Sequence, residues 1–132
     1  MKRLNISSGA KWEDIVGYSR AVRIGNVIEV AGTTSVDENG QVVGLNDPYE
    51  QTRYILAKIE KALTQAGATM KDVVRTRMFV TDISQWEEVG RAHDLYFKEI
   101  KPAASMVEVK SLISPELMVE IEVTAILGAQ GE

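Results

Sequence analysis

Residues 119–127 read Val-Glu-Ile-Glu-Val-Thr-Ala-Ile-Leu, and this stretch decides the fold. Apolar side chains alternate with Glu120 and Glu122, and alternation with a period of two predicts a β-strand whose two faces differ. Residues 73–80 show a similar pattern, with two arginines at alternate positions. The sequence therefore predicts two strands of one sheet, each with an apolar face and a face that carries charge.

Further strands complete this sheet. Residues 21–24 and 27–31 flank a Gly25-Asn26 turn that is typical of a tight hairpin, and residues 105–109 are expected to form another strand. The apolar face is expected to hold Ile28, Val30, Val74, Met78, Val107, Val109, Val119, Ile121 and Val123. The other face is expected to hold Glu29, Ala31, Arg75, Arg77, Phe79, Met106, Glu108, Glu120, Glu122, Thr124 and Ile126. This mixed face is less uniformly polar than a solvated face, so it predicts a homo-oligomer in which neighbouring subunits cover it.

Two helices are expected to cover the apolar face. The first begins at Asp47, which caps it, with Pro48 at the first helical position and Glu50 completing a capping box, and Gly67 ends it. The second helix is expected to begin at another capping box, which starts at Ser84. Their apolar stripes are predicted to comprise Ile55, Ile59, Ala62, Leu63 and Ala66 in the first helix, and Trp86, Val89, His93, Tyr96, Phe97 and Ile100 in the second.

Composition narrows the classes of function. The chain has 132 residues, which predicts a single domain over residues 1–132. It contains no cysteine and one histidine, so disulfides, thiolate chemistry and a histidine-rich metal site are not expected. A net charge of −4 without a basic run argues against nucleic acid as a partner. No signal peptide or apolar membrane span is visible, so a cytoplasmic protein without a membrane partner is expected.

An ordered set of short motifs resembles the Rid (YjgF-like) family. The motifs appear here as Gly25-Asn26, Ala31-Gly32, Gln65-Ala66-Gly67, residues 73–82, Pro102-Ala103, Val107-Glu108-Val109 and Val119-Glu120-Ile121-Glu122, with Tyr18 matching a tyrosine near the family's N-terminus. The resemblance runs in order from about residue 17 to residue 127. It implies a chorismate-mutase-like α+β sandwich, a mainly antiparallel mixed sheet with two helices on one face, and assembly as a homotrimer.

The resemblance also implies an activity. Active members of the family hydrolyse reactive imines and enamines, such as 2-iminobutanoate, to a 2-oxo acid and ammonia, without a metal or organic cofactor. Their small-molecule pockets lie in clefts between subunits, on the face of the sheet that the helices leave open. This location agrees with the mixed face expected from the strand pattern.

The family's site residues are only partly present. Glu120 occupies the position of the glutamate that handles the attacking water, and Tyr18 and Gly32 are retained. Ala104 stands where the family has an arginine that clamps the substrate carboxylate, and Met106 replaces a small residue two positions later. In the second helix, the resemblance places Gly90 where the family has an asparagine. The chain therefore resembles a divergent branch that lacks the clamp.

Each candidate residue also has a plainer interpretation. Arg77 has the correct face to replace the clamp, but the plainer interpretation, an interface salt bridge, is the one that the sequence favours. Glu120 could orient a water or pair with Arg75 or Arg77 across the sheet. His93 could act as an acid or base or be a buried histidine with a satisfied hydrogen bond, and Tyr18 could close a pocket or only pack.

Three functions remain open on the sequence alone. The first is a cofactor-free hydrolase of imines or enamines that uses Glu120. The second is a protein that binds or senses a small molecule in the same cleft without deaminating it, which the loss of the clamp at Ala104 and the change at Met106 would favour. The third is an interaction protein whose trimer is a scaffold. The natural ligand is not specified by any of these residues.

Overall fold

A six-stranded sheet forms the centre of the computed structural model, which describes residues 1–128. Its strands lie in the order β1-β2-β3-β6-β4-β5, and all neighbours are antiparallel except β4 and β5, which are parallel. The strands are β1 (Arg3–Ile6), β2 (Ala21–Ile24), β3 (Val27–Thr34), β4 (Val73–Val80), β5 (Ala103–Glu108) and β6 (Val119–Ile126). The expected α+β class and mainly antiparallel mixed sheet are confirmed.

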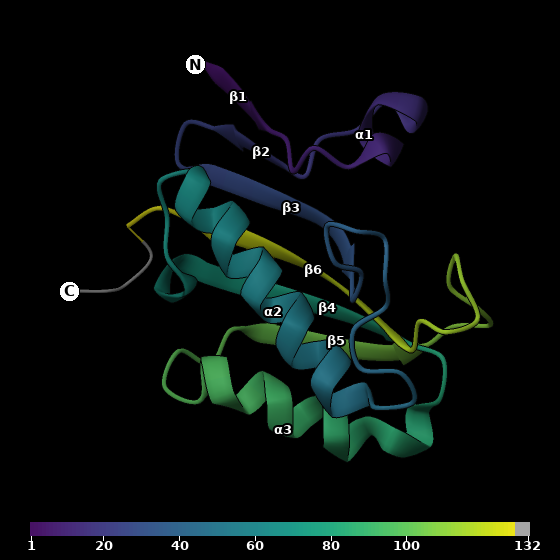
Figure 1. Ribbon diagram of the computed structural model, residues 1–132. Helices are drawn as coiled ribbons and strands as arrows, with labels where there is room; N and C mark the ends of the chain where they lie inside the picture. The colour runs from purple at the N-terminus through teal and green to yellow at the C-terminus, as the bar shows by residue number, and fades with distance from the viewer. Residues whose placement is uncertain (129–132) are drawn as a thin grey trace.

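Helices α2 (Pro48–Gln65) and α3 (Trp86–Phe97) lie on one face of this sheet, as Figure 1 shows. The predicted apolar stripe of α2 is buried throughout, and its Ile55, Ile59 and Leu63 pack with Ile28, Val119, Ile121 and Val123 of the sheet in one core. Burying each such side chain contributes about 1.5–3 kcal/mol. The helices therefore cover one face and leave the mixed face open in the single chain.

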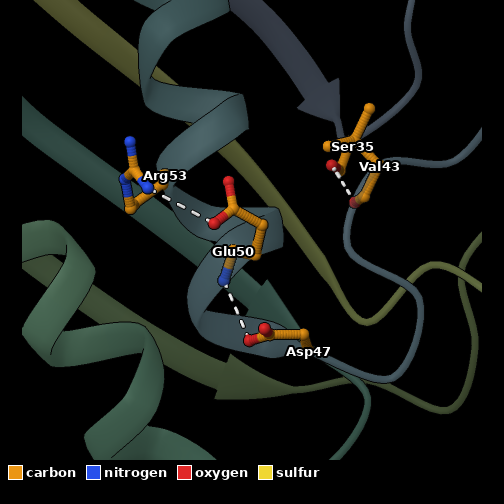
Figure 2. Close-up of polar contacts among 5 residues, drawn as sticks. All are labelled: Ser35, Val43, Asp47, Glu50 and Arg53. Atoms are coloured by element: carbon orange, nitrogen blue, oxygen red, sulfur yellow. Dashed lines mark hydrogen bonds and ion pairs between the residues drawn. The ribbon is translucent and has the colours of Figure 1, made fainter.

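The sequence correctly predicted one of the two side-chain contacts expected at the start of α2 (Figure 2). The Asp47 carboxylate accepts a hydrogen bond from the backbone N–H of Glu50 at 3.1 Å, which satisfies one of the free N–H groups of the first turn. The Glu50 side chain does not complete the expected capping box but pairs with Arg53 at 3.3 Å. Nearby, the Ser35 hydroxyl donates to the Val43 carbonyl at 2.6 Å and closes the intervening loop.

The start of α3 differs from the prediction. Ser84 does not cap the helix; instead Asp82 accepts hydrogen bonds from the backbone N–H and hydroxyl of Ser84 and begins a short 3-10 turn, Ile83–Gln85. Trp86, the first residue of α3, is 55% exposed, whereas Ala92 is buried. The buried stripe of α3 therefore leaves out Trp86 and includes Ala92.

Two strand faces also differ from the prediction. A β-bulge between Val73 and Arg75 places Val73, rather than Val74, in the core. In β5, Met106 packs against the core and is in register with Met78, whereas Val107 is 48% exposed beside Phe79. Met106 was expected on the mixed face and Val107 on the apolar face, so the orientation of β5 was predicted wrongly.

The N-terminal segment adds elements that the sequence pattern did not predict. Strand β1 pairs with β2 at the edge of the sheet, and a six-residue helix, α1 (Lys11–Val16), follows it. Both elements are too short to show a clear period, which explains why the pattern did not reveal them. Within residues 1–128, no helix has the length and apolar character needed to cross a membrane.

Candidate functional site

Charged side chains from other parts of the chain contact three consecutive residues of β3, namely Gly32, Thr33 and Thr34. Glu120, from the neighbouring strand β6, is in register with Thr34, and its side chain lies across Gly32. A Cβ atom at position 32 would overlap the Glu120 carboxylate oxygen and would lie 3.0 Å from the carboxyl carbon. Gly32 is therefore needed because its missing side chain leaves the space that the Glu120 carboxylate occupies.

The Glu120 carboxyl group has an altered acidity. Burial raises the pKa of Glu120 above its ordinary value, the nearby Glu122 carboxylate raises it further, and Arg20 acts in the opposite direction. A carboxyl group with a raised pKa exchanges protons more readily near neutral pH than an ordinary surface glutamate. This environment suits a group that accepts and returns a proton.

Arg20, the residue just before β2, also contacts the segment Gly32–Thr34. Its backbone N–H donates to the Ile6 carbonyl at 2.8 Å, and its carbonyl accepts from the Ala31 N–H at 3.0 Å. Its Nη1 donates to the Thr33 hydroxyl at 3.3 Å, and its guanidinium carbon lies 5.6 Å from the centre of the Tyr18 ring. Backbone and side-chain contacts thus direct Arg20 toward the Gly32–Thr34 segment.

Lys58 approaches this segment from α2. Its ammonium group donates to the Thr34 carbonyl at 2.8 Å and to the Val36 carbonyl at 2.9 Å. Burial lowers the pKa of Lys58 to about 8, with Arg20 lowering it further and Asp37 opposing the change. Two cationic side chains, Arg20 and Lys58, therefore lie close enough to repel each other.

A shallow hollow of about 650 Å³ opens beside this group on the mixed face. Its lining includes Tyr18, Ser19, Ala31 and four carboxylates, those of Glu13, Asp14, Glu29 and Glu122, whereas Arg20, Gly32 and Glu120 do not line it. Tyr18 is 38% exposed at its rim. Of the predicted site residues, Gly32 and Glu120 are in contact, and Tyr18 is linked to them through Arg20, which lies against its ring and donates to Thr33.

Arg77 lies elsewhere on the mixed face and has acceptors of its own. Its Nε lies 3.8 Å from Glu122 and its Nη1 donates to the Thr124 hydroxyl at 3.4 Å. Arg75 donates to the Ser105 hydroxyl at 2.8 Å. Both arginines are therefore engaged within the chain, and within the described residues neither forms the cross-strand ion pair with Glu120 that was considered for it.

Ala104 and Met106 lie on the opposite face of the sheet from Glu120. In β4, Phe79 is in register with Glu120 while its neighbour Met78 is in register with Met106, and adjacent residues of a strand point to opposite faces. Ala104 is two residues before Met106 and shares its face. Within one chain, the two halves of the site predicted from the family resemblance are therefore separated by the sheet.

His93 belongs to the helix-covered face. Its Nε2 lies 2.9 Å from the hydroxyl of Thr76, which is fully buried, and its ring contacts that of Phe97 at 4.6 Å. Burial lowers the pKa of His93, with Asp94 opposing the change. These contacts match a buried histidine with a hydrogen-bond partner.

Arg20 and Lys58 were missed by sequence reasoning. Arg20 is a lone charge directly before the buried Ala21 at the start of a strand. Lys58 lies next to Ile59, beside the buried stripe of α2. Each position is a weak sign that a charged side chain is held near the core, but neither shows that the two meet.

The fold and the Glu120 group define a small α+β protein with a polar site on the central strands, β3 and β6, of a helix-covered sheet. Residues 9–127 match the family model described as Endoribonuclease L-PSP, and the chain belongs to this family, which is also named YjgF or Rid. The resemblance seen in the sequence motifs is confirmed.

Several relatives support this assignment. The crystal structure of Rv2704 of the YjgF/YER057c/UK114 family, from Mycobacterium tuberculosis, is 53% identical with a TM-score of 0.87, covering 96% of this chain and 100% of that one. The Rid-family protein YyfA from Yersinia pestis is 32% identical with a TM-score of 0.83, covering 96% and 100%. The 3-aminoacrylate deaminase RutC of Acinetobacter baylyi is 34% identical over 104 residues, which are 79% of this chain and 82% of that protein.

Proposed function

We propose that this protein hydrolyses small reactive imines or enamines without a cofactor, with Glu120 as the group that handles water. The observation that carries the proposal is the Glu120 carboxyl group, which lies over Gly32 and has a raised pKa. A relative named as a 3-aminoacrylate deaminase supports the reaction class. The family description also names an endoribonuclease, but a net charge of −4 argues against RNA as the substrate.

The chemistry requires only water and one acid–base group. The imine reacts in its protonated form, C=NH2+, and Glu120 accepts a proton from water as the water oxygen bonds to the carbon, which gives a neutral tetrahedral amino alcohol. Glu120 then returns this proton to the nitrogen, the C–N bond breaks and ammonia leaves as the C=O bond forms, and the hydroxyl proton is released to the departing ammonia or to solvent. An imine and one water thus give one carbonyl compound and one ammonia, with Glu120 restored.

We further propose that the site is completed by a second copy of the chain in a homotrimer. Glu120 and Ala104 lie on opposite faces of one sheet, so both can line one pocket only if Ala104 comes from a neighbouring subunit. The mixed face also carries exposed apolar side chains, such as Val107 and Ile126, beside paired charges. A neighbouring subunit would bury this apolar surface.

The test is the decay of 2-iminobutanoate generated in situ by an amino-acid oxidase. We expect the wild type to accelerate its loss and Glu120→Gln to lower the rate about 100-fold or more, the usual contribution of a general acid–base group. Arg53→Met, in an exposed ion pair on α2, is the control and should retain the wild-type rate. Full activity in Glu120→Gln, or no acceleration by the wild type with any of several imines, would overturn the proposal.

The second candidate is a protein that binds a small molecule without deaminating it, and Ala104 is the observation that favours it. If the wild type is inactive but Ala104→Arg hydrolyses the imine, the scaffold is competent and the natural ligand differs. A thermal-shift screen of metabolites would then identify compounds that raise the melting temperature. Failure of every metabolite to raise it would remove support for this candidate.

A further inference from the structure

Glu120 and Glu122 are two carboxyl groups on one face of β6. They are separated by a single residue of the strand, so their side chains point to the same side of the sheet. The negative charge of one disfavours ionisation of the other, and Glu122 acts on Glu120 in this way. Which of the two carries a proton therefore depends on the other groups that each of them meets.

The neighbours of these two carboxyl groups differ. Glu122 is in register with Arg77 of β4, and its Oε1 lies 3.8 Å from the arginine Nε. Glu120 is in register with Phe79 of the same strand and forms no ion pair within the described residues. An adjacent cation favours the ionised form of a carboxyl group, whereas burial without a cation favours the neutral form. The surroundings of Glu122 thus favour its charged form, and those of Glu120 favour the bound proton.

Arg77 is oriented by a second acceptor. Its Nη1 donates to the Thr124 hydroxyl at 3.4 Å, and this hydroxyl donates to the Glu29 carboxylate at 2.7 Å. A hydroxyl has one hydrogen to donate, so the bond to Glu29 leaves the lone pairs of the Thr124 oxygen for Arg77. Glu29, Thr124, Arg77 and Glu122 form a polar ladder across strands β3, β6 and β4. The guanidinium group is therefore held beside Glu122 by contacts along the open face.

The remaining charged groups around Glu120 have other partners. Lys58 of α2 donates to two backbone carbonyls at the end of β3, and Glu108 of β5 accepts from a backbone N–H. Arg20 favours the ionised form of Glu120, but it is held by Thr33, which is buried on the helix-covered face. Within the part of the chain that the structure describes, the Arg77 ladder holds the ion pair of the sheet.

We propose that Arg77 is a positioning residue of the site: by holding Glu122 in its charged form, it leaves Glu120 as the carboxyl group that gains and loses the proton during hydrolysis. This inference rests on the proposed function and adds a residue to it. Arg77 acts on the reaction through Glu122 rather than by binding the substrate. Glu122, which lines the hollow, is then a fixed negative charge that takes no proton itself.

The pH dependence of 2-iminobutanoate hydrolysis is the first test. Glu120 must be ionised to accept a proton from water, so kcat/KM should fall as the pH drops through the pKa of Glu120. Arg77→Met removes a positive charge, so Glu120 should hold its proton more tightly, whereas Glu122→Gln removes a negative charge and should release that proton more easily. Relative to each variant's own maximum, kcat/KM on the acidic side should be about two- to sixfold lower in Arg77→Met and higher by a similar factor in Glu122→Gln.

The opposite signs distinguish this role from a folding defect, which would lower the maximum without moving the profile. Arg53→Met and Glu50→Gln remove the same two charges from an exposed ion pair on α2 and should leave the acidic side unchanged. The double variant Arg77→Met/Glu122→Gln removes both charges of the ladder's ion pair, so its profile should lie between those of the single variants. Profiles that do not move, or that move in the same direction in both single variants, would overturn the inference.

A titration without substrate separates this inference from the proposed function. The Glu120 carboxyl carbon can be followed by NMR in protein labelled with ¹³C at its glutamate carboxyl groups, and Glu120→Gln identifies the signal by its loss. The midpoint of this titration should lie at a higher pH in Arg77→Met than in the wild type, and at a lower pH in Glu122→Gln. Such displacements would support the role of Arg77 even if no imine is hydrolysed. Equal midpoints in the three proteins would overturn it even if the enzyme is active.

Discussion

Gly32 shows how one missing side chain can position a carboxylate group. The Glu120 side chain crosses the strand at this residue, with its Cγ and Cδ atoms 3.4 Å and 3.0 Å from the place where a Cβ would be. The backbone of Gly32 is not in the left-handed region, so an alanine is compatible with the local conformation. The space above Gly32, rather than its flexibility, is therefore what the site requires.

Replacing this glycine should remove activity while preserving the fold. In Gly32→Ala the new methyl group displaces the end of a flexible side chain, so we expect hydrolysis to fall about as far as in Glu120→Gln. The free energy of unfolding should change by no more than about 1 kcal/mol. Urea denaturation and the imine assay together measure both effects.

A double-mutant cycle provides the control for this prediction. With Glu120→Ala already present, the space above residue 32 is empty and Gly32→Ala should no longer destabilise the protein. The two substitutions should therefore be non-additive. Additive effects on stability would show that Glu120 does not occupy that space.

Glu120 should also make stability depend on pH. Burial, with help from Glu122, raises the pKa of Glu120 above its ordinary value of 4.5, so the folded protein holds this proton more tightly than the unfolded chain does. The contribution of Glu120 to stability is then full below pH 4.5 and is lost as the pH rises through the raised pKa of the folded state.

The permanently neutral Glu120→Gln variant makes this measurable. It should be more stable than the wild type at neutral pH, and the difference should disappear below pH 4.5, the ordinary value for glutamate. Denaturation of both proteins across this range tests the sign. A wild type that is more stable than the variant at neutral pH would show that Arg20 outweighs burial.

At the level of the elements, strands with two distinct faces were predictable. In β4 and β6, apolar and polar residues alternate clearly because each strand has a helix-covered face and a charged face. The hairpin of β2 and β3 has a recognisable turn. Strand β5 was not predictable in orientation, because an edge strand is partly exposed on both faces and its alternation carries little information. The bulge at Val74 was also invisible, since one extra residue leaves the composition unchanged.

The candidate site was predictable only where the family motifs reached it. Tyr18, Gly32 and Glu120 were identified from the resemblance; the structure places Glu120 over Gly32 and Tyr18 against Arg20. Arg20 and Lys58 come from segments 38 residues apart in the sequence. Their meeting depends on how α2 crosses β3, which no local pattern records.

At the level of the whole molecule, the sheet divides the site into two halves. The Glu120 half is open on the mixed face, and Ala104 and Met106 lie on the other face. We expect light scattering at micromolar concentration to give about three times the 14.6 kDa mass of one chain. A stable monomer that hydrolyses imines would contradict the proposed completion of the site by a second copy.

The contact between Gly32 and Glu120 has a consequence for how this protein can evolve. A lineage that keeps the glutamate cannot accept any side chain at position 32 without displacing the carboxylate. Selection is therefore expected to act against substitutions that replace this glycine. A lineage that first loses the glutamate is released from this restriction. The two positions are therefore expected to be inherited as a pair, and a relative with a larger residue at position 32 is expected to have abandoned the chemistry as well as the glycine.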